Sequence, residues 1–466
     1  MGGPGTTGTA VEGKMSDEAV VTAVRGRVLT FTAEPAALAG ADRDHRYIPD
    51  GLVVMRDGLI QAVGDAAVLL RALPPGTSVD HHPDGLVMPG FVDAHIHYPQ
   101  TRVIGSYGAQ LLEWLRDYTF PEEERLRDPD HAAATARFFL DELLRNGTTT
   151  AAVYCTVHPA SVEAFFAESE RRGTRMIAGK VMMDRNAPPG LLDTAERGYR
   201  ESEALLRRWH GRGRQLYAIT PRFALTSTDA QLEAAGALAR AHPTAHVQTH
   251  LSENHAEIAA TKALFPWARS YAGVYARYGL LGPRSLFGHC IHLEDEEVEL
   301  LAETGSVAVF CPTSNLFLGS GLFDLARLRR RPVPVRVAVA TDVGGGTSYS
   351  MLRTAAEAYK VLQLRGQSWP ALDAFRMITR GNAEALGLGD RVGALEPGYE
   401  ADLVVLDARA TPAMAHRMAG TGDDLSEELF ALLTLGDDRA VAATYVAGRR
   451  VVPVGARHVR GAEPVR

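Results

Sequence analysis

The sequence is poor in cysteine, has no excess of basic residues and lacks any long apolar run. Its three cysteines, Cys155, Cys290 and Cys311, cannot build a disulfide framework, which fits a reducing compartment such as the cytoplasm. A formal net charge of -7 does not indicate a basic surface that would bind nucleic acid or anionic membranes. No stretch of about 18 apolar residues is present, so no membrane span is expected. What remains is a globular chain of 466 residues with an ordinary hydrophobic content of 46%.

Both ends of the chain differ from its middle. Residues 1–16 are rich in Gly and Thr and lack the apolar core of a signal peptide, so we expect a disordered tail, with Met1 or Met15 as the start. Apolar runs and the dipeptide Asp57-Gly58 predict strands and a hairpin within residues 17–87. Residues 391–466 show similar strand-like runs. We expect these two segments to form one small β-sandwich domain, the alternative being two unrelated flaps.

The middle of the chain, residues 88–390, alternates strand-length apolar runs with helix-length amphipathic segments. This alternation indicates an α/β fold with a parallel sheet, and about eight units predict a closed (β/α)8 TIM-like barrel. A doubly wound open sheet is the alternative, although no glycine-rich dinucleotide fingerprint follows the first strand. The expected strands are Phe91–Ile96, Thr148–Tyr154, Arg175–Met182, Gln215–Thr220, Thr244–Thr249, Ser285–His289, Val307–Phe310 and Val335–Thr341.

Reactive side chains stand at the predicted ends of four of these strands. His95 and His97 end the first strand, and residues two apart on a strand point to the same side. His250, His289 and Asp342 end the fifth, sixth and eighth strands. Because barrel enzymes place their active sites at the carboxyl ends of the strands, we expect these side chains to meet at one rim.

Neutral imidazoles and a carboxylate are ligands that suit Zn2+, and iron can use the same set. A structural zinc site would be closed and rich in cysteine, whereas this set leaves a position open for water. Glu253 follows His250 by three residues, where a carboxylate can serve as a general acid and base. The alternative for Glu253 is a helix-capping carboxylate. The pattern therefore indicates a catalytic metal site.

Several spaced motifs resemble one known group of enzymes. Residues 89–97 (PGFVDAHIH) are similar to the metal motif of the amidohydrolase superfamily, with Ala94 where that superfamily usually has Thr. Within the superfamily, the chain from about residue 47 to 450 resembles the guanine deaminases of bacteria. That resemblance rests on Tyr98-Pro99-Gln100, on Thr220-Pro221-Arg222-Phe223, and on residues 106–119 (SYGAQLLEWLRDYT), 181–188 (VMMDRNAP), 250–254 (HLSEN), 311–316 (CPTSNL) and 341–347 (TDVGGGT).

The resemblance implies a role for each matching residue. It implies one Zn2+ per subunit on His95, His97, His250 and Asp342, and catalysis by Glu253, Asp342 and His289. It implies a substrate-binding set of Gln100, Arg222, Phe223, His250, Glu253 and His289. It also implies a homodimer. Lys180 lies inside the third expected strand, so we interpret it as structural rather than as a carboxylated bridge between two metals.

The activity that the resemblance implies is hydrolysis of guanine to xanthine and ammonia in purine catabolism. Arg222 offers only donors, which match the oxo group of guanine and oppose the amino group of adenine. Core packing is the alternative for Phe223. Two other functions stay open. One is a related aminohydrolase that acts on 8-oxoguanine, a pterin or a triazine, and the other is a metal-free barrel that serves as an assembly protein.

Overall fold

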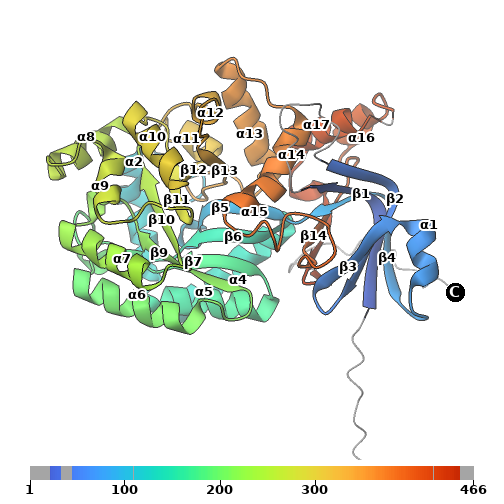
Figure 1. Cartoon of the computed structure of the whole chain (residues 1–466), viewed down its shortest axis with the longest axis horizontal. Helices are drawn as coiled ribbons and strands as arrows, with labels where there is room; N and C mark the ends of the chain where they lie inside the picture. Colours follow the sequence, from blue (N-terminus) through green and yellow to red (C-terminus); the bar gives the residue numbers. More distant parts are fainter. Residues whose placement is uncertain (1–20, 33–44, 109, 423, 452–466) are drawn as a thin grey trace, which may run out of the picture.

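The computed structural model describes residues 21–32, 45–108, 110–422 and 424–451. The predicted tail at residues 1–16 and the choice between Met1 and Met15 lie outside these residues. Figure 1 shows two parts, a strand barrel surrounded by helices and a twisted sheet that carries the early strands of the chain.

The first part is a parallel barrel, as predicted. Each strand pairs with the next in the order of the chain, and all residues of these strands except Leu216 and Arg336 are buried. Beyond the last strand, the N–H of Asp342 donates to the carbonyl of His95 (2.9 Å), and that of His97 donates to the carbonyl of Val343 (2.8 Å), which joins the last strand to the first. The strands are β5 (Phe91–His97), β6 (Thr148–Tyr154), β7 (Arg175–Gly179), β9 (Gln215–Pro221), β10 (His246–Leu251), β11 (Ser285–His289), β12 (Val307–Phe310) and β13 (Arg336–Val339).

One predicted strand is divided in the structure, and two helices that follow β5 are separated by a short break. The strand expected at 175–182 breaks at Lys180, whose buried ammonium group pairs with Asp193, and its second piece is β8 (Val181–Met182), which pairs with β9. Between β5 and β6, α3 (Phe120–Arg125) and α4 (Pro129–Arg145) are two separate helices. Asp128 caps α4 by accepting from the N–H of Asp130, and proline at the first helical position loses no hydrogen bond.

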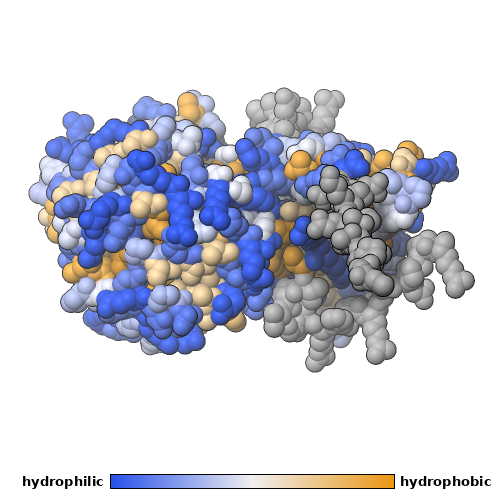
Figure 2. Space-filling view, turned by 90° about the horizontal axis from the view of Figure 1, so that it is seen from below, coloured by the Kyte–Doolittle hydropathy of each residue, from blue (hydrophilic) through white to orange (hydrophobic). Residues whose placement is uncertain are grey.

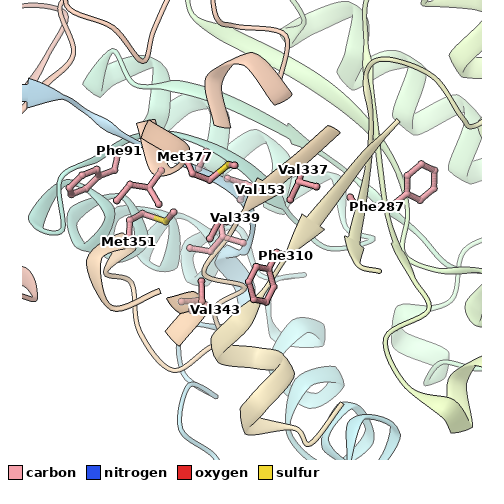
Figure 3. Close-up of a cluster of buried hydrophobic side chains, with 14 of the residues drawn as sticks. Phe91, Val153, Phe287, Phe310, Val337, Val339, Val343, Met351 and Met377 are labelled. Atoms are coloured by element: carbon pink, nitrogen blue, oxygen red, sulfur yellow. The ribbon is translucent and has the colours of Figure 1, made fainter. Parts of the chain in front are cut away.

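Helices follow the barrel strands and cover them. Their starts are set locally by side-chain caps: Thr194 accepts from the N–H of Arg197, and Thr228 accepts from that of Gln231. Figure 3 shows Met351 of α13 packed near Val339 and Val343 within the apolar core. The helices are α4, α5 (Pro159–Arg172), α6 (Ala195–Trp209), α7 (Asp229–Ala241), α8 (His255–Leu264), α9 (Tyr271–Arg277), α10 (Asp295–Thr304), α11 (Pro312–Phe317), α12 (Leu325–Arg329), α13 (Met351–Leu364), α14 (Ala371–Arg376) and α15 (Asn382–Ala385).

The second part is one mixed sheet built from both ends of the chain. Its order is β16-β15-β14-β4-β1-β2-β3, so the antiparallel pairing of β14 with β4 joins the C-terminal strands to the N-terminal ones, as predicted. Asp57 and Gly58 turn the chain between β2 and β3 with φ of 53° and 80°. The elements are β1 (Val21–Phe31), β2 (His45–Arg56), β3 (Leu59–Asp65), β4 (Ser78–Pro89), β14 (Leu403–Leu406), β15 (Val441–Val446) and β16 (Arg449–Val451), with α1 (Ala66–Leu69), α16 (Pro412–Met418) and α17 (Leu425–Leu435).

Ion pairs join this sheet to the amino-terminal ends of the barrel strands. Arg175 begins β7, Arg214 directly precedes β9, and both contact the carboxylate of Glu400. Arg214 also pairs with Asp402, at 2.5 Å. The small sheet is thus held at the barrel end opposite to the rim where His97 and Asp342 lie.

On the face shown in Figure 2, apolar residues form small patches among hydrophilic ones. Within the described residues, no helix is both long enough and apolar enough to cross a bilayer.

Candidate metal centre and active site

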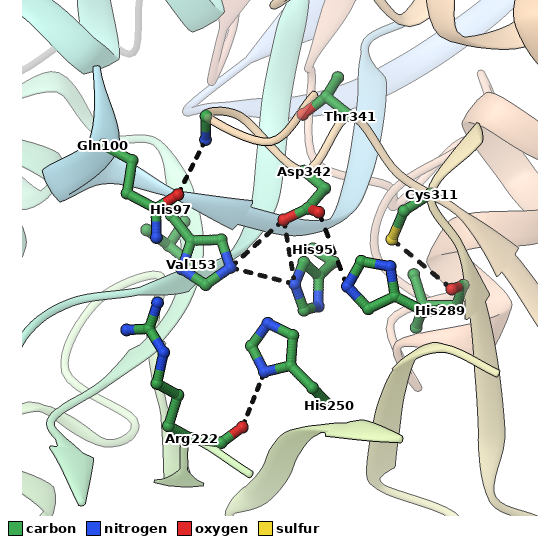
Figure 4. Close-up of polar contacts among 12 residues, drawn as sticks. His95, His97, Gln100, Val153, Arg222, His250, His289, Cys311, Thr341 and Asp342 are labelled. Atoms are coloured by element: carbon green, nitrogen blue, oxygen red, sulfur yellow. Dashed lines mark hydrogen bonds and ion pairs between the residues drawn. The ribbon is translucent and has the colours of Figure 1, made fainter. Parts of the chain in front are cut away.

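The end of β5 and the loop after β13 bring three ligand atoms together. The Nε2 atoms of His95 and His97 lie 3.2 Å apart. Each of them lies 3.3 Å from Oδ1 of Asp342 (Figure 4). All three side chains are buried, so water does not screen them. His95 and His97, two residues apart on β5, therefore point to the same side, as the sequence predicts. Closure of the barrel brings the carboxylate of Asp342 beside them.

Two further imidazoles reach the same rim from β10 and β11. Nδ1 of His250 lies 2.7 Å from the backbone carbonyl of Arg222, and Nδ1 of His289 lies 2.8 Å from Oδ1 of Asn315. Because these oxygens only accept, each Nδ1 must donate, which leaves Nε2 free to act as a ligand or an acceptor. Nε2 of His289 lies 3.4 Å from Glu253 and 3.6 Å from Asp342.

The backbone at this rim is strained. Ser252, His289, Cys290 and Asp342 all have φ between 51° and 72°, in the left-handed region that residues other than glycine rarely adopt. Strained backbone conformations persist only where the surrounding structure holds them in place, and they are concentrated at functional sites.

The electrostatics favour neutral imidazoles beside an ionised carboxylate. Burial lowers the pKa of His97 to about 3 and lowers the pKa of His250 well below its ordinary value. Burial opposes the ionisation of Asp342, but hydrogen bonding and charge from His95, with help from His97, hold its pKa well below the usual range. Neutral nitrogen and anionic oxygen are the donor states that a divalent cation requires.

The spacing of these donors fits a single cation. Ligand atoms held about 2.0–2.1 Å from a tetrahedral ion lie about 3.3 Å from one another. The separations of 3.2 and 3.3 Å among His95, His97 and Asp342 agree with that value. Donor atoms of His95, His97 and His250, and likewise of His95, His289 and Asp342, lie within 4.8 Å of one another. The residues present therefore fit a buried metal ion.

Glu253 lies beside this cluster, just after β10. Its Oε1 accepts a hydrogen bond from the hydroxyl of Ser320 (3.1 Å). Burial, assisted by the negative charge of Asp342, raises the pKa of Glu253 to about 8. A carboxyl group with such a pKa can both hold and release a proton near neutral pH. The helix cap of α8 is made instead by Asn254 with Glu257, so Glu253 is not the capping residue.

The expected recognition residues share one cavity with the ligands. Gln100 follows β5, while Arg222 and Phe223 follow β9, and each is less than 5% exposed. This cavity lies at the carboxyl ends of the barrel strands. It is lined by His97, Gln100, Leu111, Trp114, Leu115, Arg222, Phe223, His250, Glu253, His289, Ser314, Leu318, Asp342 and Gly345.

Sequence reasoning missed part of this site. Leu111, Leu115 and Leu318 line the cavity, but apolar residues in helical segments look alike whether they face a core or a pocket. Glu123 was also missed, although it bonds both Gln100 and Arg222. It belongs to the run PEEER, where nothing in the sequence separates it from its acidic neighbours.

Lys180 lies outside the cavity lining and is already paired. Its Nζ contacts Asp193 and lies 3.6 Å from Glu201. These contacts agree with its interpretation as a structural residue.

A barrel with imidazoles and a carboxylate gathered at the carboxyl ends of its strands defines a metal-dependent enzyme of the TIM-barrel class. Residues 86–451 match the family described as "Amidohydrolase family". The chain belongs to this family, in its guanine deaminase branch. Guanine deaminase of Escherichia coli K12 is 48% identical over 440 residues, which cover 94% of this chain and 99% of that protein.

Solved structures agree with this assignment. The structure described as "E. coli Guanine Deaminase" has a TM-score of 0.90 at 47% identity and covers 93% of this chain and 100% of that one. A guanine deaminase from C. acetobutylicum, with guanine bound in its active site, has a TM-score of 0.81 at 28% identity and covers 93% and 100% of the two chains.

Proposed function

We propose that the protein is a metal-dependent guanine deaminase, which hydrolyses guanine to xanthine and ammonia. The observation that carries this proposal is the convergence of the donor cluster, Glu253 and the Arg222–Gln100 pair on one buried cavity. The alternative of a metal-free assembly barrel has no support here, because all of the expected ligands are present and face one another.

The proposed ligands are His95, His97, His250 and Asp342, with one Zn2+ per chain and iron as the alternative ion. A bound cation of this kind supplies hydroxide at neutral pH by lowering the pKa of water towards about 7. The hydrogen bond from His250 to the carbonyl of Arg222 supports this assignment, because it fixes the ring tautomer.

Recognition is proposed to depend on matching donors to acceptors. Arg222 presents donors to the oxo group at C6 of guanine, and Gln100 can both donate and accept along the same edge. Adenine carries an amino donor at C6 and would leave the buried guanidinium unpaired, which opposes its binding. Phe223 is proposed to stack on the purine. Its ring also meets His250, with centroids 6.2 Å apart.

Protons are proposed to move through three side chains. Glu253 takes a proton from the attacking water and passes it to ring N3, which makes C2 more electrophilic. Asp342 accepts the second proton and helps to deliver it to the departing amine. Nε2 of His289 lies near both carboxylates and holds the attacking water. The overall reaction converts guanine and water to xanthine and ammonia.

The test measures ammonia release by the purified, metal-loaded protein from guanine, 8-oxoguanine, adenine, a pterin and a triazine. Guanine should be the preferred substrate. No release of ammonia from guanine at millimolar concentration would contradict the proposal, and faster release from 8-oxoguanine, the pterin or the triazine would favour the related aminohydrolase. Elemental analysis in the same preparation identifies the metal and its ratio to protein.

Two finer proposals concern the state of the protein in the cell. The three buried, unpaired cysteines support a reducing compartment, and we propose the cytoplasm. We also propose a homodimer, the commonest symmetric assembly, which analytical ultracentrifugation would test.

A further inference from the structure

Glu123 of α3 lies against the two side chains that are proposed to read the substrate edge. Its carboxylate is fully buried. Nη1 of Arg222 donates to both of its oxygens at 2.8 Å, and Nε2 of Gln100 donates to Oε1 at 2.9 Å. The buried carboxylate of Glu123 thus links Gln100 to Arg222, and the three residues come from three separate segments of the chain.

The helix α3 presents a face that is shaped to the guanidinium. Phe120 and Glu123 are one turn apart, and residues three apart lie on the same side of a helix. Cζ of Arg222 lies 5.5 Å from the centroid of the Phe120 ring, so ring and carboxylate hold the same cation. The neighbouring Glu122 pairs instead with Arg125 and His131.

These contacts determine which donors remain for a ligand. In the described part of the chain, Glu123 engages Arg222 only through Nη1, so Nη2 and Nε keep their hydrogens for the cavity. The amide of Gln100 is also fixed. Its Oε1 accepts from the N–H of Gly344 (3.1 Å), and its Nε2 must face the carboxylate, which can only accept.

We propose that Glu123 is the positioning residue that makes the site select a purine with an oxo group at C6. It acts through Arg222 and Gln100, and the proposal rests on the proposed function. Without its charge, the buried guanidinium has no counter-ion and the amide of Gln100 loses the acceptor that orients it, so donors no longer converge on the position of the oxo group.

Two substrates isolate this effect. Guanine and 2-aminopurine both carry the amino group at C2, but 2-aminopurine has hydrogen in place of the oxo group. The variant E123Q should lower kcat/KM for guanine by about 10- to 100-fold, the scale of a lost hydrogen bond to a charged group, while kcat/KM for 2-aminopurine stays nearly unchanged. Metal content should equal that of the wild type. The control E122Q removes an adjacent buried, paired carboxylate and should keep the wild-type ratio.

A second test measures the energetic coupling between Glu123 and Arg222. In an R222Q background, the E123Q change should cost far less than it does in the wild type, because the partner through which Glu123 acts is gone. Equal losses on both substrates, or additive losses in the double variant, would overturn the proposal. If E123Q does not fold, E123D keeps the charge but shortens the reach, and an unchanged guanine preference in E123D would overturn the proposal. A wild-type protein that releases no ammonia from guanine overturns the proposed function as well.

Discussion

The imidazole of His95 occupies the space that a side chain at position 288 would take. Gly288 lies on β11, and a Cβ built on it would stand 2.7 Å from Cε1 of His95. Cβ atoms in proteins essentially never come within 3.0 Å of a non-bonded heavy atom. The glycine is therefore required by the neighbouring ring, because the ring cannot move without leaving the 3.3 Å spacing to Asp342.

We expect Gly288→Ala to displace His95 and to lower both bound metal and turnover. Loss of one ligand position in a site of this kind lowers metal affinity by about 10- to 100-fold, by analogy with the loss of supporting residues around metal ligands. Elemental analysis after dialysis measures the metal. Gly282→Ala is the matched control, since its nearest neighbour atom would lie 3.9 Å away. Full metal content in Gly288→Ala would contradict the prediction.

We expect Glu253→Gln to keep its metal and lose most of its turnover. An amide of the same shape cannot carry the proton, and a positioned general acid and base contributes about 10²- to 10⁴-fold to the rate. Steady-state rates of ammonia release and metal content are measured together. The exposed Glu296 supplies a control, and Glu296→Gln should behave as the wild type. Unchanged turnover in Glu253→Gln would remove this residue from the proton pathway.

We expect Arg222→Ala to weaken the use of guanine while leaving the metal in place. The variant loses the guanidinium donors but keeps the backbone carbonyl that accepts from His250. The loss in kcat/KM should reach about 100-fold or more, because the hydrogen bonds lost are charged ones. A variant that loses metal instead would show that Arg222 is structural.

We expect Glu400→Gln to destabilise the protein at neutral pH but much less in acid. Burial opposes the ionisation of Glu400, yet Arg175 and Arg214 outweigh it, so its pKa in the folded protein is lowered. A carboxyl group with a lowered folded pKa stabilises above its unfolded pKa, and this contribution is lost as the pH falls through the folded value. Breaking one partner of such a part-buried network costs about 3 kcal/mol at neutral pH.

Thermal unfolding of the wild type and of Glu400→Gln, measured from neutral to acid pH, tests the prediction. The difference in Tm should be largest near pH 7 and shrink below the ordinary glutamate value of 4.5. A difference that stays constant with pH would show that packing, rather than charge, accounts for the role of Glu400.

Local patterns in the sequence predicted much of this molecule. The alternation of strand and helix predicted the barrel, and His95 and His97 were recognised because a spacing of two on a strand needs no tertiary information. Element ends were harder to predict. The break at Lys180 depends on its ion pair with Asp193, and the break before Pro129 on the cap formed by Asp128.

The sequence by itself determined the succession of strands and the chemical identity of the ligands, since periodicity and residue type are local properties. Only the tertiary structure decided which of the adjacent glutamates at 122, 123 and 124 contacts Gln100 and Arg222. Glu123 meets Arg222 across 99 positions of the chain, and no local signal encodes such a contact. Barrel closure likewise decided that Asp342 and His95 meet within 3.3 Å, because only closure brings the last strand beside the first.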